Sequence, residues 1–375
     1  MIKIEKRRTP QVWTTVLVGV VAITISLIFS TILLQIMGYN AVEVFSESFK
    51  KTYFTIPGIL ENTLMLIPLS LCALSVAVAA KAGLWNIGVD GQFLVGALVA
   101  TGVALAFPNL PQPFIFILMF SAGMIAAGLL CYISVLPRVY FGISEILTTI
   151  LMNSVVLYFV RYLVYDAWKD PGTVAAQTPE ISAAAKLPIL IPGSRVHLGL
   201  IVAILVVILI HYFINKTISG YEMRAVGDNA RGAKYAGINV KKYFFIAMLL
   251  SGCLAGIAGM LEISGVVHRL QPTISADYGF SAFVIAWVAR LDTVAILIIS
   301  YLFAGLVVAG FKMQMMGFPA SVTFMLKGLI LILVLAGEML TYYKISWVKK
   351  SSQVNNVKNG ASSLEEPNNT AEGGY

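Results

Sequence analysis

The chain has 375 residues, of which 58% are hydrophobic and 12% are charged, against roughly 25% charged residues in soluble domains. Together with a mean hydropathy of +0.86, this composition excludes a soluble globular protein. Several apolar runs are continuous and reach the ~20 residues that cross hydrocarbon as a helix. A membrane β-barrel would instead alternate apolar and polar residues. We therefore expect an all-α, polytopic membrane protein.

The formal net charge of +8 does not indicate a nucleic-acid ligand. If both termini lie in the cytoplasm, most of the 26 Lys and Arg residues fall on the cytoplasmic side, as the positive-inside rule requires. The three cysteines lie inside apolar runs without metal-ligand spacing, which favours small core residues over a disulfide framework: Cys72, Cys131 and Cys253.

Ten crossings are expected, each an apolar run bounded by a polar connection or by Pro and Gly. They cover residues 13–37, 58–80, 93–107, 114–136, 145–165, 198–215, 244–267, 279–289, 293–311 and 321–340. The run 279–289 is too short for an ordinary crossing, so a re-entrant half-helix would serve as well. Residues 1–350 are expected to form one transmembrane domain. Residues 351–375, rich in Asn, Ser, Glu and Gly, are expected to form a disordered cytoplasmic tail.

The segment 82–92, AGLWNIGVDGQ, interrupts two apolar helices near membrane depth. Irregular backbone survives there only where protein or a water-filled path satisfies it. Three polar residues cluster within one turn of the interruption: Asn86, Asp90 and Gln92. They favour a substrate path or gate, although a tight cytoplasmic turn would explain the same residues. Glu145 and Asn153 in the fifth span are further candidates, because polar groups in a membrane are costly; snorkelling at the span ends is the alternative.

The basic segment 216–243 separates two spans and carries its own helix signals. Residues 221–226 can form a short helix that Gly227 ends. Asp228 or Asn229 can then cap a second helix through Ala236, which Gly237 ends. Small residues on this second helix would let another backbone approach closely. This segment fits a docking element, whereas the alternative is a basic loop that binds phospholipid head groups.

No enzymatic motif is present. The chain lacks the G-x-x-x-x-G-K-[ST] phosphate loop, so it is not itself the ATPase of a pump. The three histidines have no ligand spacing. We therefore expect no catalytic residues, no metal and no cofactor.

Four segments resemble bacterial ABC-importer permeases of the nucleoside and simple-sugar branch, within the ribose and branched-chain amino-acid permease family. They are AKAGLWNIGVDGQFLVGA, GISEILTTILMNSVVLYFV, GYEMRAVGDNARGAKYAGINVKKY and GFPASVTFMLKGLILILVL. One departure is AFVIAWVARLDTV, where Trp287 is bulkier than the family pattern and a proline is absent.

The resemblance implies a permease subunit in a bacterial cytoplasmic membrane that forms the path for a nucleoside or simple sugar. Its implied partners are a cytoplasmic ABC ATPase, a second related permease, an extracytoplasmic solute-binding lipoprotein and membrane lipid. The implied ATPase-coupling residues are Glu222, Arg224, Gly227, Asn229, Arg231, Ala233, Lys234, Tyr235 and Gly237. Ala233 is expected at the contact with the ATPase.

The connection 166–197 would face the binding protein, with Lys169, Lys186 and Arg195 as its docking cations. A lid that does not touch the partner is the alternative. Two other functions stay open. An ion-coupled secondary transporter would use Asp90, Glu145 or Glu262 as carriers, and a membrane-embedded enzyme or scaffold would show no solute flux.

Overall fold

The computed structural model describes residues 2–6, 12–36, 38, 40–275, 277–341 and 343–347. The expected tail, 351–375, lies outside these residues. The first seven helices are α1 (Val12–Ile36), α2 (Ala41–Tyr53), α3 (Ile56–Lys81), α4 (Val89–Ala106), α5 (Gln112–Phe141), α6 (Glu145–Tyr165) and α7 (Gly199–Lys216). The others are α8 (Ile218–Asp228), α9 (Ala230–Tyr235), α10 (Val240–Glu262), α11 (Tyr278–Val288), α12 (Thr293–Met315) and α13 (Ala320–Thr341).

The expected polytopic helical membrane protein is confirmed. Among the described residues, seven helices are long and apolar enough to cross a membrane: α3, α4, α5, α6, α7, α12, and α10 continued by the π-helix η2 (Ile263–Val267). Shorter apolar helical stretches lie in α1, α11 and α13. The ends of the described chain add one small antiparallel sheet of β1 (Ile2–Lys6) and β2 (Tyr343–Trp347).

Helix α11 corresponds to the short run 279–289. Its 11 residues extend about 16 Å at 1.5 Å per residue, roughly half of the ~30 Å hydrocarbon core. It is therefore a half-helix, and the described residues before it, 268–275 and 277, are not helical.

Helix α10 is the centre of the packing and contacts α3, α4 and α5. Its glycines make this possible. A Cβ at Gly259 would lie 2.0 Å from the Phe93 carbonyl oxygen, and one at Gly96 would lie 2.3 Å from the Gly256 carbonyl oxygen. Gly252, Gly256 and Gly259 thus form a close-packing face of α10. Small residues let helices approach where lipid supplies no hydrophobic drive.

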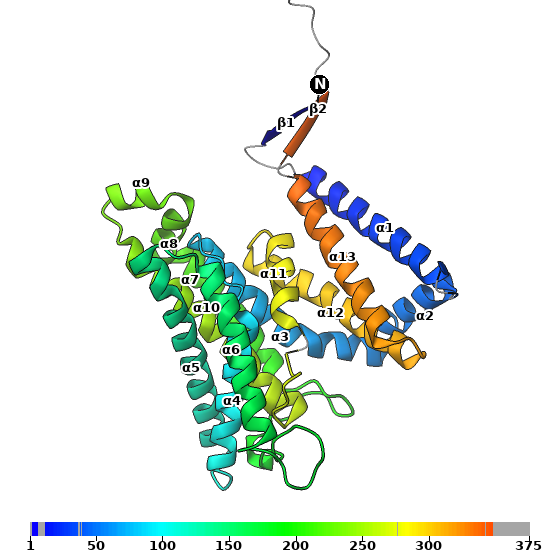
Figure 1. Cartoon of the computed structure of the whole chain (residues 1–375), viewed down its shortest axis with the longest axis vertical. Coiled ribbons are helices and arrows are strands. Elements are labelled where there is room, and N and C mark those ends of the chain that lie inside the picture. The colour runs from blue at the N-terminus through cyan, green and yellow to red at the C-terminus, as the bar shows by residue number, and fades with distance from the viewer. Residues whose placement is uncertain are drawn as a thin grey trace, which may run out of the picture.

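The terminal helices lie apart from this bundle. In Figure 1, α1 and α13 run side by side, with α2 and α12 below them, while α11 lies between them and the bundle. The connection 38–57 contains the helix α2, which begins where the Asn40 side chain accepts the Glu43 N–H. Helix α5 also differs from expectation, because it continues through Pro137 and ends at Gly142, whose φ is +70°.

Candidate translocation and coupling site

The interruption between α3 and α4, residues 82–88, is held by a buried amide network. The Asn86 amide nitrogen donates to the Gln92 Oε1 and to the Ser251 hydroxyl, both at 2.8 Å. The Gln92 amide returns a hydrogen bond of 2.9 Å to the Asn86 Oδ1, which also accepts the Gly88 N–H. These two predicted path residues therefore satisfy each other and fasten the interruption to α10.

Asp90 joins α4 to the half-helix α11. Its Oδ1 accepts the Gly279 N–H at 2.8 Å, close to the start of α11, where backbone N–H groups lack partners within the helix. A Cβ at Gly279 would lie 2.7 Å from this carboxylate. A negative charge here also opposes the positive end of the helix dipole. The position of α11 thus depends on Asp90.

The two predicted residues of α6 reach the same interruption. Glu145 accepts the Trp85 N–H at 3.2 Å and forms an ion pair with the Arg138 Nε at 3.3 Å. Asn153 accepts the Gly91 N–H at 2.8 Å and donates to the Ile87 carbonyl at 2.9 Å. The chain therefore brings all five predicted path residues to the α3–α4 interruption: Asn86, Asp90, Gln92, Glu145 and Asn153.

Helices α8 and α9 form the predicted pair in the basic segment. The Asn229 side chain caps α9 by accepting the Gly232 N–H at 3.0 Å, and Gly237 follows with φ +83°. The predicted end of the first helix at Gly227 is wrong, because α8 continues to Asp228. Gly227 has another role. A Cβ there would lie 2.2 Å from the Lys81 carbonyl oxygen, so its hydrogen side chain lets α8 lie directly on the end of α3.

Two coupling candidates fasten α8 to its neighbours. Glu222 accepts a hydrogen bond from the Tyr243 hydroxyl of α10. The Arg224 guanidinium donates to the Ile214 carbonyl at 2.7 Å, at the end of α7. These contacts connect movement of α8 to two spans as well as to the α3–α4 interruption.

The outward face of α9 differs from the expectation. Ala233 is buried against the chain's own core, with 6% of its surface exposed, so it does not present itself to a partner. The exposed side chains are Arg231, Lys234 and Tyr235, the last 94% exposed. Ala233 thus packs inward, whereas Ala236 of the same helical series is exposed, and contact of α9 with the ATPase stays a prediction.

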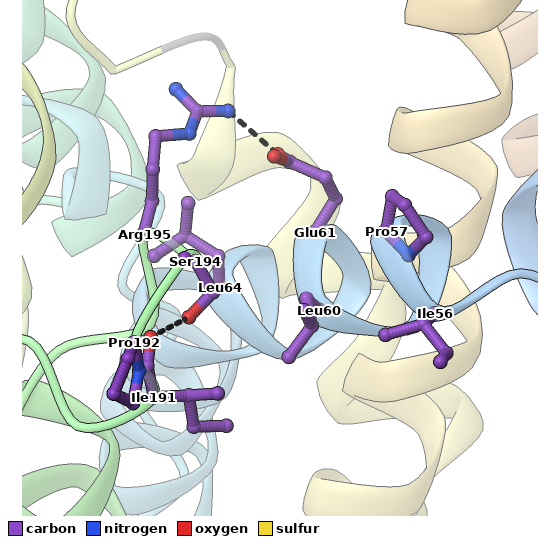
Figure 2. A pocket seen from close by; sticks show the side chains of 10 residues that line it. Ile56, Pro57, Leu60, Glu61, Leu64, Ile191, Pro192, Ser194 and Arg195 are labelled. Carbon is purple, nitrogen blue, oxygen red and sulfur yellow. Dashed lines mark hydrogen bonds and ion pairs between the residues drawn. The ribbon is translucent and has the colours of Figure 1, made fainter.

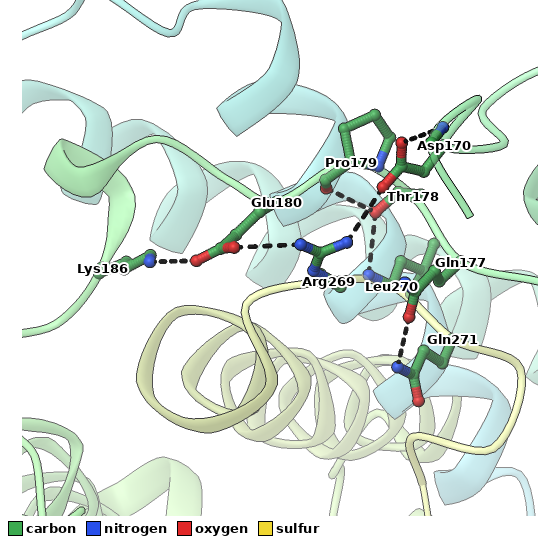
Figure 3. Close-up of polar contacts among 10 residues, drawn as sticks. Asp170, Gln177, Thr178, Pro179, Glu180, Lys186, Arg269, Leu270 and Gln271 are labelled. Carbon is green, nitrogen blue, oxygen red and sulfur yellow. Dashed lines mark hydrogen bonds and ion pairs between the residues drawn. The ribbon is translucent and has the colours of Figure 1, made fainter. Parts of the chain in front are cut away.

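The connection 166–197 is fastened to the chain after α10. Figure 3 shows the Arg269 guanidinium between two carboxylates, 3.0 Å from Asp170 and 3.1 Å from Glu180. Glu180 also pairs with Lys186, and these two cations lower the pKa of the Glu180 carboxyl. The Leu187 N–H adds a hydrogen bond of 2.8 Å to a carbonyl of η2. The connection is therefore an ordered cover over the end of α10.

A further ion pair joins the connection 166–197 to the start of α3. The Arg195 guanidinium lies 2.7 Å from the Glu61 carboxylate, at a cavity of about 460 Å³ between the start of α3 and residues 191–195 (Figure 2). Two predicted docking cations, Lys186 and Arg195, are thus engaged within the chain. Lys169 is exposed and makes no ion pair among the described residues. Sequence reasoning missed Glu61, Glu180 and Asp170 as partners, because long-range charge pairing leaves no local pattern.

The family model described as "Branched-chain amino acid transport system / permease component" matches residues 58–335, which include every path and coupling residue discussed above. This chain belongs to that permease family. It is accordingly a transport subunit of an ABC importer and not an enzyme. No solved structure matches the chain significantly.

Three relatives cover most of the chain. The nucleoside ABC transporter permease NupB of Lactococcus lactis subsp. cremoris is 30% identical over 82% of this chain and 87% of its own length. The glucose ABC transporter permease TsgB13 of Haloferax volcanii is 29% identical, covering 92% and 93%. The guanosine ABC transporter permease NupP of Bacillus subtilis is 29% identical, covering 90% and 97%.

Proposed function

We propose that this permease carries a nucleoside or simple sugar, delivered by an extracytoplasmic binding protein and driven by a separate cytoplasmic ATPase. The observation that carries the proposal is the contact between α8 and the α3–α4 interruption. Gly227 lies directly on the Lys81 backbone, while the exposed Arg231, Lys234 and Tyr235 of α9 offer a surface to a partner. Force applied to α9 would reach the interruption through one rigid contact.

The transport cycle then has two states of the chain. Nucleotide on the ATPase and a loaded binding protein each favour one arrangement of the spans, as differential binding requires. In this structure, hydrogen bonds among Asn86, Gln92 and Ser251 hold the α3–α4 interruption against α10. We expect its hydrogen bonds to rearrange when α8 moves.

Topology and partners complete the proposal. Residues 1–350 form the permease domain of a bacterial cytoplasmic membrane protein with both termini in the cytoplasm, and 351–375 form its tail. A second related permease completes the path. Lys169 and the outer face of residues 166–197 receive the binding protein, with Lys186 and Arg195 contributing after their internal partners release them.

Solute uptake tests the function. The complete transporter in proteoliposomes should accumulate labelled nucleoside or sugar when ATP is supplied on the side of the membrane that carries the ATPase. Uptake should persist after the proton and sodium gradients are collapsed. Loss of uptake on collapse would favour the ion-coupled alternative.

Changing Lys169, Lys186 and Arg195 together to Glu should slow association of the loaded binding protein, with a smaller effect at high salt. Unchanged association at low ionic strength would refute the docking assignment.

A further inference from the structure

A cavity of about 450 Å³ lies between α11 and α13 and belongs neither to the coupling helices nor to the outer cover. Its lining comes from both helices and the residue before α11: Asp277, Phe280, Ser281, Phe324, Lys327 and Gly328. Asp90, which caps α11, adjoins it and interacts electrostatically with Asp277 and Lys327. The volume falls within the range of small-molecule sites, about 300–1,000 Å³.

The walls of this cavity combine flat apolar surfaces with a few polar groups. Phe280 and Phe324 are each 57% exposed and present phenyl rings from the two helices. Asp277 and Lys327 supply opposite charges that balance each other, while the adjoining Asp90 carboxylate is already hydrogen-bonded to the Gly279 N–H. Such a lining suits a neutral solute that has both a planar ring and hydroxyl groups.

One polar atom in the lining lacks a partner. The Ser281 side chain is 1% exposed, and its hydroxyl makes no hydrogen bond within the described part of the chain. A buried polar group without a partner is costly. A bound solute that hydrogen-bonds this hydroxyl would remove that cost.

An aromatic face leads from the cavity to the α3–α4 interruption. Phe280, Phe283 and Trp287 follow at i, i+3 and i+7 and therefore share one side of α11. The Trp287 ring lies 5.3 Å from that of Trp85, centroid to centroid, and Trp85 is 43% exposed in the interruption. The Trp287 indole N–H is also buried without an acceptor among the described residues. A planar solute leaving the cavity would meet stacking surfaces all along this face.

We infer that this cavity is a nucleoside site on the translocation path. The base stacks on Phe280 and Phe324, the ribose hydroxyls hydrogen-bond Asp277 and Lys327, and the Ser281 hydroxyl bonds a polar atom of the solute. The face that ends at Trp287 and Trp85 forms the way out. The inference rests on the proposed function and narrows its solute to a nucleoside, because the two faces of a planar base match two phenyl rings while its ribose supplies the hydroxyl groups.

Gly328 allows a direct test. A Cβ at this helical position would meet open space, so Gly328→Trp fills the cavity without displacing backbone. In proteoliposomes that contain the complete transporter, this variant should abolish uptake of labelled guanosine and uridine. Phe324→Ala and Ser281→Ala should raise the KM of uptake about tenfold. Phe324→Tyr, which keeps the aromatic ring, should leave the KM as in the wild type.

A matched control is Phe159→Ala, which removes an exposed aromatic ring of α6 outside the cavity and should leave uptake unchanged. Size-exclusion chromatography checks that each variant transporter folds and assembles. If Gly328→Trp does not assemble, uptake by the conservative variant Ser281→Ala decides the test. Labelling by 8-azidoadenosine should map to α11 or α13 and be lost on addition of unlabelled guanosine.

The outcomes separate the two proposals. Nucleoside uptake with wild-type kinetics in Gly328→Trp and Ser281→Ala would overturn the site while the proposed function holds. Uptake of glucose alone, still blocked by Gly328→Trp, would overturn the nucleoside assignment. If the wild type carries neither solute, the proposed function fails, and absence of azidoadenosine labelling at α11 and α13 would overturn the site as well.

Discussion

Substitution of Gly227 by Ala should uncouple ATP hydrolysis from transport. The added Cβ would stand 2.2 Å from the Lys81 carbonyl oxygen and 3.0 Å from the Gly83 nitrogen, whereas favourable contacts between carbon and its neighbours lie at ~3.5 Å. Helix α8 must therefore move away from the interruption by about 1 Å.

The expected size of the effect follows from that clash. Overpacking costs about 1–3 kcal/mol, and each 1.4 kcal/mol is a factor of ten. If this energy is lost from the transport-competent contact, solute moved per ATP hydrolysed should fall about fivefold to a hundredfold. The readout is this ratio, measured in proteoliposomes that contain the full complex. Membrane insertion should be retained, since the change lies at the end of α8 and outside the α10 packing.

The matched control is Gly310→Ala in α12. Its added Cβ would have the Thr323 Cβ at 3.9 Å as its nearest neighbour, an ordinary contact distance, so transport should be normal. A wild-type ratio of solute to ATP in Gly227→Ala would refute the view that α8 transmits force through this contact.

Three further predictions concern stability and the outer side. Gly259→Ala should lower the melting temperature in detergent, because its Cβ would lie 2.0 Å from the Phe93 carbonyl; an unchanged melt would contradict the packing argument. Burial lowers the pKa of His197 from 6.5 to about 4, so the unfolded chain takes up the proton first. The contribution of neutral His197 to the free energy of unfolding should then be fully present above pH 6.5 and be lost, by up to about 3 kcal/mol, as the pH falls towards 4. His197→Gln should flatten the dependence of the melting temperature on pH, and an equally steep dependence in that variant would refute the assignment. Arg195→Glu should expose residues 191–195 to protease, and the added exchange Glu61→Arg should restore protection; because the pair is partly exposed, the effect should be ~1 kcal/mol or less, and failure of the double exchange to restore protection would exclude the pair.

Much of the membrane architecture is readable from local pattern. Long apolar runs define their own helices, since every backbone group must be satisfied internally in lipid. The length of the run 279–289 indicated a short helix and left a crossing and a re-entrant half-helix both open. The Asn229 cap and the left-handed Gly237 were also predictable, because both depend on neighbouring residues and on backbone conformation.

The candidate site was only partly readable. Motifs singled out the five candidate path residues and the candidate coupling segment, but they did not reveal which atoms meet. The pattern presented Ala233 as an outward contact, yet its side chain is buried against its own chain. Gly227 looked like a helix end because glycine has that role often, whereas here close approach to Lys81 requires it.

The sequence by itself determined the membrane class, the approximate spans, the helix signals in the basic segment and the family resemblance. The class and the resemblance follow from composition and motifs. The spans and helix signals depend on residues that are near one another in the chain. Only the tertiary structure decided that Asp90 caps α11, that Arg195 pairs with Glu61 and that α11 and α13 enclose a cavity. These contacts join residues more than a hundred positions apart or helices of different spans. Their geometry depends on how glycine-lined helices pack, which no local pattern encodes.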